Sequence, residues 1–245
     1  MKESAAAEEG QENTFYDHYS RDKPTRFGNW LTNSVSKLIF KFARIKPECS
    51  VLEIGPGRGV FADICLSKNI DYWAIEPNEK MADDLEKRGA NVIRVIVPPL
   101  PEMDRSFDVI VMSHVMEHMD NMTAALRLSK GIYQLLSPGG RFVICVPDYI
   151  NWKHHFFQGD FTHNYITTWR RMQGLLISAG FENIEGSYQC GPFKGIICFL
   201  ISAPAVWLPF GYFSTMFPKN KWLYKLYKLQ INFLRRVLIL GEKSS

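Results

Sequence analysis

The chain has 245 residues and a formal net charge of +4, with 46% hydrophobic and 22% charged residues. This composition excludes a disordered protein, and the length suits one α/β domain with additions. The small net charge gives no argument for nucleic-acid binding. Its five cysteines contain no CxxC pair, which argues against a disulfide framework and a cysteine zinc site. We therefore expect a reduced, cytoplasmic protein.

The chain opens with a polar segment and a helical pattern. Residues 1–12 are mostly polar, so we expect a disordered tail and no secretory signal. Apolar residues recur at helical spacing over 28–45, and Pro47 interrupts that pattern. We expect 13–47 to form an N-terminal helical cap or lid.

Strand patterns then alternate with helical patterns. The expected strands are 50–54, 71–76, 91–97, 107–112, 141–146 and 181–189. The expected helices are 60–68, 78–88, 121–136 and 167–179. Because most of the strands are nearly continuous apolar runs, this alternation predicts a parallel sheet with helices on both faces.

The last part of the chain is apolar and basic. Residues 195–217 carry no charge, and residues 219–236 carry six basic and no acidic side chains. Pro204 and Pro209 argue against a straight membrane span. Contact with an anionic membrane, a cap over a substrate pocket and a dimer interface all stay open. Residues 236–241 are expected to form the last strand.

The strongest functional signal is a glycine-rich turn after the first strand. The run VLEIGPGRG contains Glu53, followed by Gly55, Gly57 and Gly59. Glycines allow a sharp turn and a close approach of ligand to backbone. Glu76 ends the second strand, where an acid can accept hydrogen bonds from ribose hydroxyls. The third glycine comes one residue earlier than in the dinucleotide fingerprint GxGxxG.

The ExGxGxG pattern together with Glu76 resembles motif I and the acidic ribose-binding position of class I S-adenosylmethionine-dependent methyltransferases. The segments 107–111, 113–118 and 135–142 are similar to that family's fourth strand, the following loop and the turn into its fifth strand. The resemblance covers about 48–190. It implies a Rossmann-like α/β fold with a seven-stranded, mostly parallel sheet, helices on both faces and an antiparallel last strand.

The resemblance also implies the ligand and the organisation of the chain. The cofactor is expected to be S-adenosylmethionine, with S-adenosylhomocysteine as product. The core is expected at 48–191, an apolar and basic insertion at 192–232, and the last strand with a tail at 233–245. The residues expected to bind cofactor are Glu53, Gly55, Gly57, Gly59, Glu76, Pro77, Ser113, His114, Tyr16 and Tyr19. No acid follows the third strand, so we expect apolar and backbone contacts to hold the adenine.

Candidates for catalysis follow the fourth and fifth strands, because ligands bind beyond the carboxyl ends of parallel strands. They are His114, Glu117, His118, Asp148, Tyr149, His154, His155, Asp160 and His163. The segment DFTH at 160–163 resembles a D-x-T-H segment beside the acceptor pocket in relatives. We favour His163 or His118 as general base, with His114 and Asp160 as further candidates. The alternative is that these groups only hold a loop in place.

The segment HVMEH at 114–118 matches an inverted zinc-protease motif. That motif needs a helix that places both histidines on one face. Here the segment follows a strand, so we expect no metal.

These patterns together predict an S-adenosylmethionine-dependent methyltransferase acting on a small-molecule, glycan or lipid-linked acceptor by O-methylation with a His/Asp base. The alternative is a non-catalytic cofactor-binding or scaffold protein with a degenerate methyltransferase fold. We expect no nucleic-acid partner. Residues 195–236 could contact the inner face of a membrane peripherally. A homodimer is also left open.

Overall fold

The computed structural model describes residues 25–245. The predicted tail, the first part of the predicted lid, Tyr16 and Tyr19 lie outside the described residues. The strands are β1 (Ser50–Ile54), β2 (Asp71–Ile75), β3 (Asn91–Ile93), β4 (Phe107–Ser113), β5 (Leu136–Pro147), β6 (Glu182–Cys190), β7 (Phe193–Lys194) and β8 (Arg236–Glu242). The helices are α2 (Arg26–Phe42), α3 (Val60–Leu66), α4 (Glu79–Lys87), η1 (Met116–His118), α5 (Met122–Leu135), α6 (Tyr149–Trp152), α7 (His155–Gly159), α8 (Trp169–Ala179), α9 (Gly195–Ala205), α10 (Phe210–Met216) and α11 (Lys221–Asn232).

The strands form one sheet in the order β3-β2-β1-β4-β5-β8-β6-β7. The first five strands are parallel, and β8 runs antiparallel between β5 and β6. The predicted fold class and the antiparallel last strand are therefore confirmed. The sheet has eight strands where seven were predicted, because the chain turns at Gly191 (φ 49°) and β7 pairs briefly with β6.

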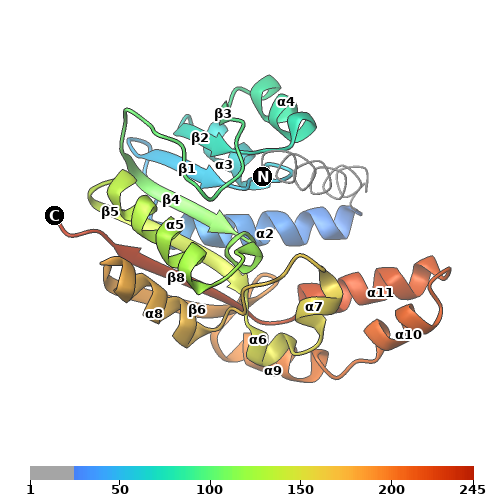
Figure 1. The fold of residues 1–245 in the computed structure, drawn as a ribbon. Helices are drawn as coiled ribbons and strands as arrows, with labels where there is room; N and C mark the ends of the chain where they lie inside the picture. The colour runs from blue at the N-terminus through green and yellow to red at the C-terminus, as the bar shows by residue number, and fades with distance from the viewer. Residues whose placement is uncertain (1–24) are drawn as a thin grey trace, which may run out of the picture.

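Helices cover both faces of the sheet, and each face has its own apolar core. On one face, Ile39 of α2, Phe61 of α3 and Leu85 of α4 pack against the strands. On the other face, Ile132 of α5 and Met172 of α8 do so. Figure 1 shows α2 on one side of the sheet and α5 on the other. This two-sided burial explains the nearly continuous apolar sequence of the central strands.

The third strand is shorter than predicted. We expected it to run over 91–97, but β3 ends at Ile93. Its neighbour β2 ends at Ile75, which pairs with Ile93, so the residues that follow have no strand to pair with. The apolar residues beyond β3 instead pack, partly buried, against the core on the α5 side of the sheet.

The apolar and basic segment folds into three helices after β7. In its apolar part, Gly195–Met216, the most apolar 18-residue window has a mean hydropathy of 1.8 and is 28% buried. It is the single stretch in the described chain that is long and apolar enough to cross a membrane. The stretch divides into α9 and α10, which are separated at 206–209. The predicted break in the apolar run is therefore present.

Helices α9, α10 and α11 follow β7 and are joined to the carboxyl end of the sheet through the short helices α6 and α7. Figure 1 shows α6, α7 and α9 beyond the arrowheads of β4 and β5. Phe156 of α7 packs with Ala205 and Val206, at the end of α9, in a third apolar cluster. Arg235, just before β8, forms a buried ion pair with Asp148 (2.7 Å). The helices therefore border the edge of the sheet where a ligand is expected.

Candidate active site

The turn after β1 has left-handed backbone at all three glycines, with φ of 71° at Gly55, 54° at Gly57 and 69° at Gly59. A Cβ added at Gly55 would lie 2.5 Å from Cγ2 of Val115, in the loop after β4. A Cβ at Gly57 would meet nothing within 4 Å among the described residues. Gly55 therefore brings two loops into contact, whereas the residues in 25–245 leave space open above Gly57.

Glu76 lies directly after β2 and faces this turn. Its carboxylate accepts hydrogen bonds from the backbone N–H of Gly57 (3.2 Å) and of Asn78 (2.9 Å). Burial raises the pKa of Glu76, and the two N–H donors partly offset that effect. Since a carboxylate has about four acceptor positions, Glu76 can still accept hydrogen bonds from a ligand. Pro77, which follows it, is half-buried.

Glu53 is buried beneath the turn and is held by a residue that the sequence analysis did not identify. The hydroxyl of Tyr72 in β2 donates a hydrogen bond to its carboxylate (2.5 Å). The pKa of Glu53 is raised to about 7, mainly by burial; the Tyr72 hydrogen bond opposes this shift and the charge of Glu76 adds to it. Tyr72 lies one strand away, and only the register of β1 and β2 brings it to Glu53.

The loop after β4 places His114 beside the glycine turn. His114 has left-handed backbone (φ 58°), and its N–H donates to the carbonyl of Cys145 in β5 (2.8 Å). Its ring Nδ1 lies 3.1 Å from Oε1 of Glu117. A non-glycine residue in this conformation is strained, and such strain clusters at functional sites. Ser113, which ends β4, is half-buried.

Glu117 is a fully buried carboxylate surrounded by histidines. Burial alone raises its pKa, but His114, His118 and His163 more than offset this, and the net shift of the pKa is downward. Glu117 is therefore ionised at neutral pH. Its Oε2 has no hydrogen-bond partner within the described part of the chain.

The segment 160–163 folds back onto this carboxylate. Thr162 donates its hydroxyl hydrogen to Asp160 (2.6 Å), and its oxygen lies 2.7 Å from Nδ1 of His118. Nδ1 of His163 lies 2.6 Å from the carbonyl oxygen of Phe156, and its Nε2 lies 4.0 Å from Glu117. The structure thus brings three predicted candidates, His114, His118 and His163, around Glu117, and Asp160 is linked to this cluster through Thr162. The sequence analysis quoted Thr162 but gave it no role.

Other predicted candidates have structural partners away from this cluster. Asp148 is paired with Arg235, and burial raises its pKa while Arg235 partly offsets that effect. His155 is buried between the hydroxyl of Tyr227 and the carbonyl of Val206. Tyr149 packs on Phe156 and Phe157. His154 is exposed and stacks on His155.

A mostly parallel sheet of this order, with a glycine turn after β1 and an acid after β2, is typical of class I S-adenosylmethionine-dependent methyltransferases. A family model for methyltransferase domains matches residues 19–185, more than half of the chain. The chain therefore belongs to the methyltransferase domain family.

The comparisons with individual proteins agree with this assignment. Uncharacterized methyltransferases from Mycobacterium sp. strains JLS and KMS are each 26% identical over 133 residues, which are 51% of this chain and 52% of theirs. The chain thus spans about half the length of these curated relatives. A solved methyltransferase from Thermotoga maritima is 19% identical, with a TM-score of 0.59 and coverage of 95% of this chain and 98% of that chain. The N-methyltransferase NodS of Bradyrhizobium japonicum is 12% identical, with a TM-score of 0.60 and 88% coverage of both chains. At these identities, the two structures support the fold alone.

The residues at the turn fit S-adenosylmethionine, the cofactor of this class. The open space above Gly57 admits a ligand against the backbone, and Glu76 offers acceptor positions for the ribose hydroxyls. The roles of individual residues toward the cofactor stay predictions.

Proposed function

We propose that the protein transfers the methyl group of S-adenosylmethionine to a hydroxyl group of a lipid-linked acceptor at a membrane surface. The observation that carries the proposal is the His114–Glu117 pair next to the glycine turn (3.1 Å). S-adenosylmethionine supplies, when bound, an electrophilic methyl group with a good leaving group. The chain then has to align the acceptor hydroxyl and remove its proton.

His114 suits the role of general base best among the histidines. With Nδ1–H directed at Glu117, the neutral ring keeps Nε2 free to accept the hydroxyl proton. The side chain of His114 is 38% exposed, whereas that of His163 is 7% exposed, so an acceptor reaches His114 more readily. The neighbouring Val115 packs on Gly55 and so keeps His114 close to the cofactor turn. We therefore prefer His114 to the His163 and His118 favoured from sequence.

The acceptor class is proposed from the surface of α9, α10 and α11. Its large apolar side chains are exposed, among them Trp207 at 73% and Trp222 at 74%. The others are Ile196, Ile197, Phe199, Leu200, Leu208, Tyr212, Phe213, Met216, Phe217, Tyr224, Leu226 and Leu229. An apolar patch of this size is unusual on a soluble monomer and marks an interaction surface.

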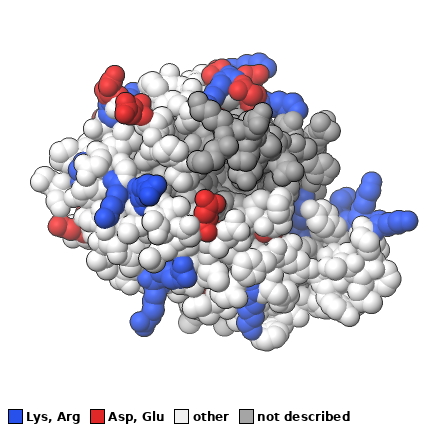
Figure 2. All heavy atoms as spheres, viewed as in Figure 1, with Lys and Arg blue, Asp and Glu red and all other residues white. Residues whose placement is uncertain are grey.

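Lysines accompany the aromatic residues of this surface. Lys225 lies 5.1 Å from the ring centre of Trp222, and Lys228 lies 4.7 Å from that of Tyr224. Lys153 lies 3.7 Å from the ring centre of Trp207. Residues 195–236 contain no acid, and in Figure 2 the region of α10 and α11 shows blue and white atoms without red ones. Aromatic residues with lysines and without acids suit an anionic lipid surface.

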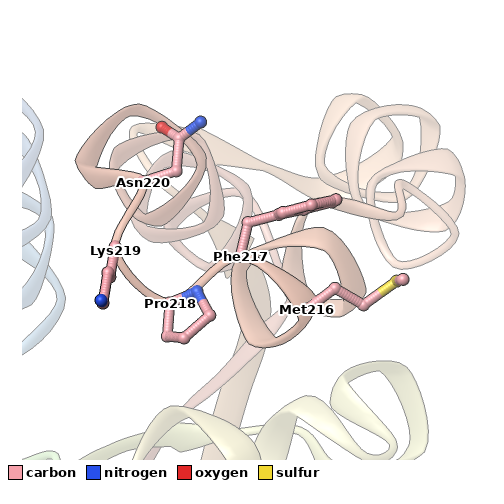
Figure 3. A pocket seen from close by; sticks show the side chains of 5 residues that line it. All are labelled: Met216, Phe217, Pro218, Lys219 and Asn220. Atoms are coloured by element: carbon pink, nitrogen blue, oxygen red, sulfur yellow. The ribbon is translucent and has the colours of Figure 1, made fainter.

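The turn between α10 and α11 also exposes large apolar side chains, with Met216 and Phe217 each 54% exposed. Met216, Phe217, Pro218, Lys219 and Asn220 line an open hollow of about 560 Å³ there. Figure 3 shows Met216 and Phe217 extending from the turn in one direction, while Lys219 extends away from them. This arrangement supports insertion of the apolar side chains among lipids while Lys219 stays at the headgroups.

The proposed membrane surface is connected to the active site by α7. Phe156 packs against α9, and its carbonyl oxygen is the partner of His163. A lipid-linked acceptor can therefore keep its tail in the membrane while its polar head reaches His114. A soluble acceptor would leave the exposed apolar helices without a role.

The proposed chemistry is tested by methyl transfer from tritiated S-adenosylmethionine to a lipid extract of the source cells. The wild type should incorporate label into solvent-extractable lipid. His114→Asn keeps a donor near the Nδ1 position but has no Nε2, so the rate should fall by about 100-fold or more. His154→Asn makes the same change at an exposed histidine and should retain the wild-type rate. Unchanged transfer by His114→Asn would contradict the assignment of the base.

The membrane surface is tested by flotation with vesicles of anionic and of zwitterionic phospholipid. The wild type should float with the anionic vesicles, and Trp222→Ala should reduce the recovered fraction several-fold. Ile177→Ala alters a comparably exposed apolar side chain in α8 and should leave recovery unchanged. Equal recovery of all three proteins, with dissociation of a dimer by Trp222→Ala, would show instead that this surface joins two copies of the chain.

A further inference from the structure

Three potential ligands converge beneath His114. Glu117, His118 and His163 each offer one donor atom, and these three atoms lie within 4.8 Å of one another. Glu117 and His163 are buried, and His118 is half-buried. The proposed methyl-transfer chemistry uses only Oε1 of Glu117 and leaves its Oε2 and both of these histidines without a function.

The hydrogen bonds of the two histidines determine which nitrogens are free. Thr162 gives its own hydrogen to Asp160, so it accepts Nδ1–H from His118. The carbonyl of Phe156 likewise accepts Nδ1–H from His163. Nε2 of each ring therefore carries a lone pair in the neutral form. Histidines that bind metals characteristically donate their other N–H to a carbonyl or to a group linked to a carboxylate.

Both histidine rings lie beside a buried carboxylate. Nε2 of His163 lies 4.0 Å from Oε1 of Glu117, and Oε2 of Glu117 has no hydrogen-bond partner among the described residues. A buried carboxylate oxygen without a partner is costly, and an imidazole lone pair near the carboxylate adds repulsion. A cation at this place would remove both effects.

We propose that Glu117, His118 and His163 bind a divalent first-row transition-metal ion through Oε2 and the two Nε2 atoms. Two imidazoles and one carboxylate form a donor set that suits such ions and leaves further coordination positions open. Donor atoms around such an ion lie about 3 to 3.5 Å apart, so the three groups need to close by about 1 Å. The sequence predicts no metal because the segment 114–118 follows a strand, but the fold adds a third potential ligand, His163, from the segment after α7.

The ion would complement His114. A bound ion would make an acceptor hydroxyl at an open coordination position more acidic, and Nε2 of His114 would accept its proton. This consequence for catalysis rests on the proposed function, whereas the binding of the ion does not. The two oxygens of Glu117 would then serve different partners, Oε1 for His114 and Oε2 for the ion.

The test is a titration of the full chain with Co²⁺ after chelation and dialysis, followed by visible absorption. The wild type should bind one equivalent and develop the d–d bands of a nitrogen- and oxygen-ligated ion. Glu117→Gln and His163→Asn should each weaken binding at least tenfold. His154→Asn, outside the cluster, should bind like the wild type. The proposal would be overturned if the wild type did not bind one equivalent of Co²⁺. It would also be overturned if the wild type bound Co²⁺ no more tightly than Glu117→Gln and His163→Asn.

Two further measurements separate this proposal from folding and from the proposed function. Each variant should bind S-adenosylmethionine and keep a cooperative unfolding transition, and His118→Gln provides a second loss of a ligand if Glu117→Gln unfolds. The chelated wild type could transfer methyl groups at its full rate and also fail to bind Co²⁺. That result would overturn the metal site and leave the methyltransferase function intact. Co²⁺ binding without methyl transfer to any lipid extract would support the site and contradict the proposed function.

Discussion

Glu53 places a titratable acid in the core directly beneath the glycine turn. Its pKa is raised to about 7 mainly by burial, although Tyr72 donates a hydrogen bond to it. The folded state therefore holds a proton on Glu53 that the unfolded chain loses near pH 4.5. The stability contributed by the protonated acid is fully present below pH 4.5 and is lost as the pH rises through 7.

Glu53→Gln tests this linkage, because glutamine keeps the acceptor for Tyr72 and does not titrate. The free energy of unfolding of the wild type relative to Glu53→Gln should fall by about 3 kcal/mol between pH 4.5 and pH 8. Urea unfolding of both proteins at several pH values measures the difference. A difference that does not depend on pH would show that the acid is not protonated in the folded state.

Gly55 and Gly57 should respond differently to alanine although both have left-handed backbone. Gly55→Ala adds a clash with Val115 to the backbone strain and should lower the free energy of unfolding by about 2–3 kcal/mol. Gly57→Ala adds only the strain, about 1 kcal/mol, but its methyl group enters the space proposed for cofactor. Calorimetry should show at least tenfold weaker binding of S-adenosylmethionine by Gly57→Ala. If Gly57→Ala bound S-adenosylmethionine with wild-type affinity, the cofactor would not bind against Gly57.

At the scale of elements, one buried ion pair joins β8 to the helices at the carboxyl end of the sheet. Arg235 pairs with Asp148, and its carbonyl accepts from the indole N–H of Trp152 in α6. Asn151 accepts from the backbone N–H of Arg235 and donates to the carbonyl of Ser202 in α9. The position of α9 therefore depends on residues far away in the sequence.

Asp148→Ala should therefore lower the free energy of unfolding by about 2–4 kcal/mol, because it leaves a largely buried guanidinium without its partner. Chemical denaturation measures the loss. Asp104→Ala, a change at an exposed acid in the loop before β4, should cost much less and serves as the control. A loss below about 1 kcal/mol would mean that Arg235 finds another partner and that the pair does not hold α9.

The sequence predicted the strands and turns whose residue pattern depends only on neighbouring residues in the chain. Apolar runs and the glycine turn predicted β1, β2, β4 and the turn, since burial on both faces leaves a continuous pattern. The pairing of Glu53 with Tyr72 and the folding of His163 onto Glu117 could not be predicted, because both depend on register and on loop conformation. The positive φ of His114 has no sequence signal either, since glycine is the residue expected there.

At the scale of the whole molecule, the structure has two functional sides at one end of the sheet. The glycine turn and Glu76 lie at the carboxyl ends of β1 and β2, and His114 follows β4. The exposed apolar helices α9–α11 lie beyond β5 (Figure 1). The cofactor is therefore expected at the sheet, and the proposed function places the acceptor between the cofactor and the proposed membrane surface. The reversal of strand order between β1 and β4 brings the two sides together.

Binding of S-adenosylmethionine, measured by calorimetry on the wild type and on Glu76→Ala, tests the central claim most directly. We predict binding of one cofactor per chain by the wild type. Glu76→Ala should bind at least tenfold more weakly, because the ribose hydroxyls lose a charged acceptor worth about 1.5–3 kcal/mol. Absence of binding by the wild type, or equal affinity of both proteins, would contradict the account.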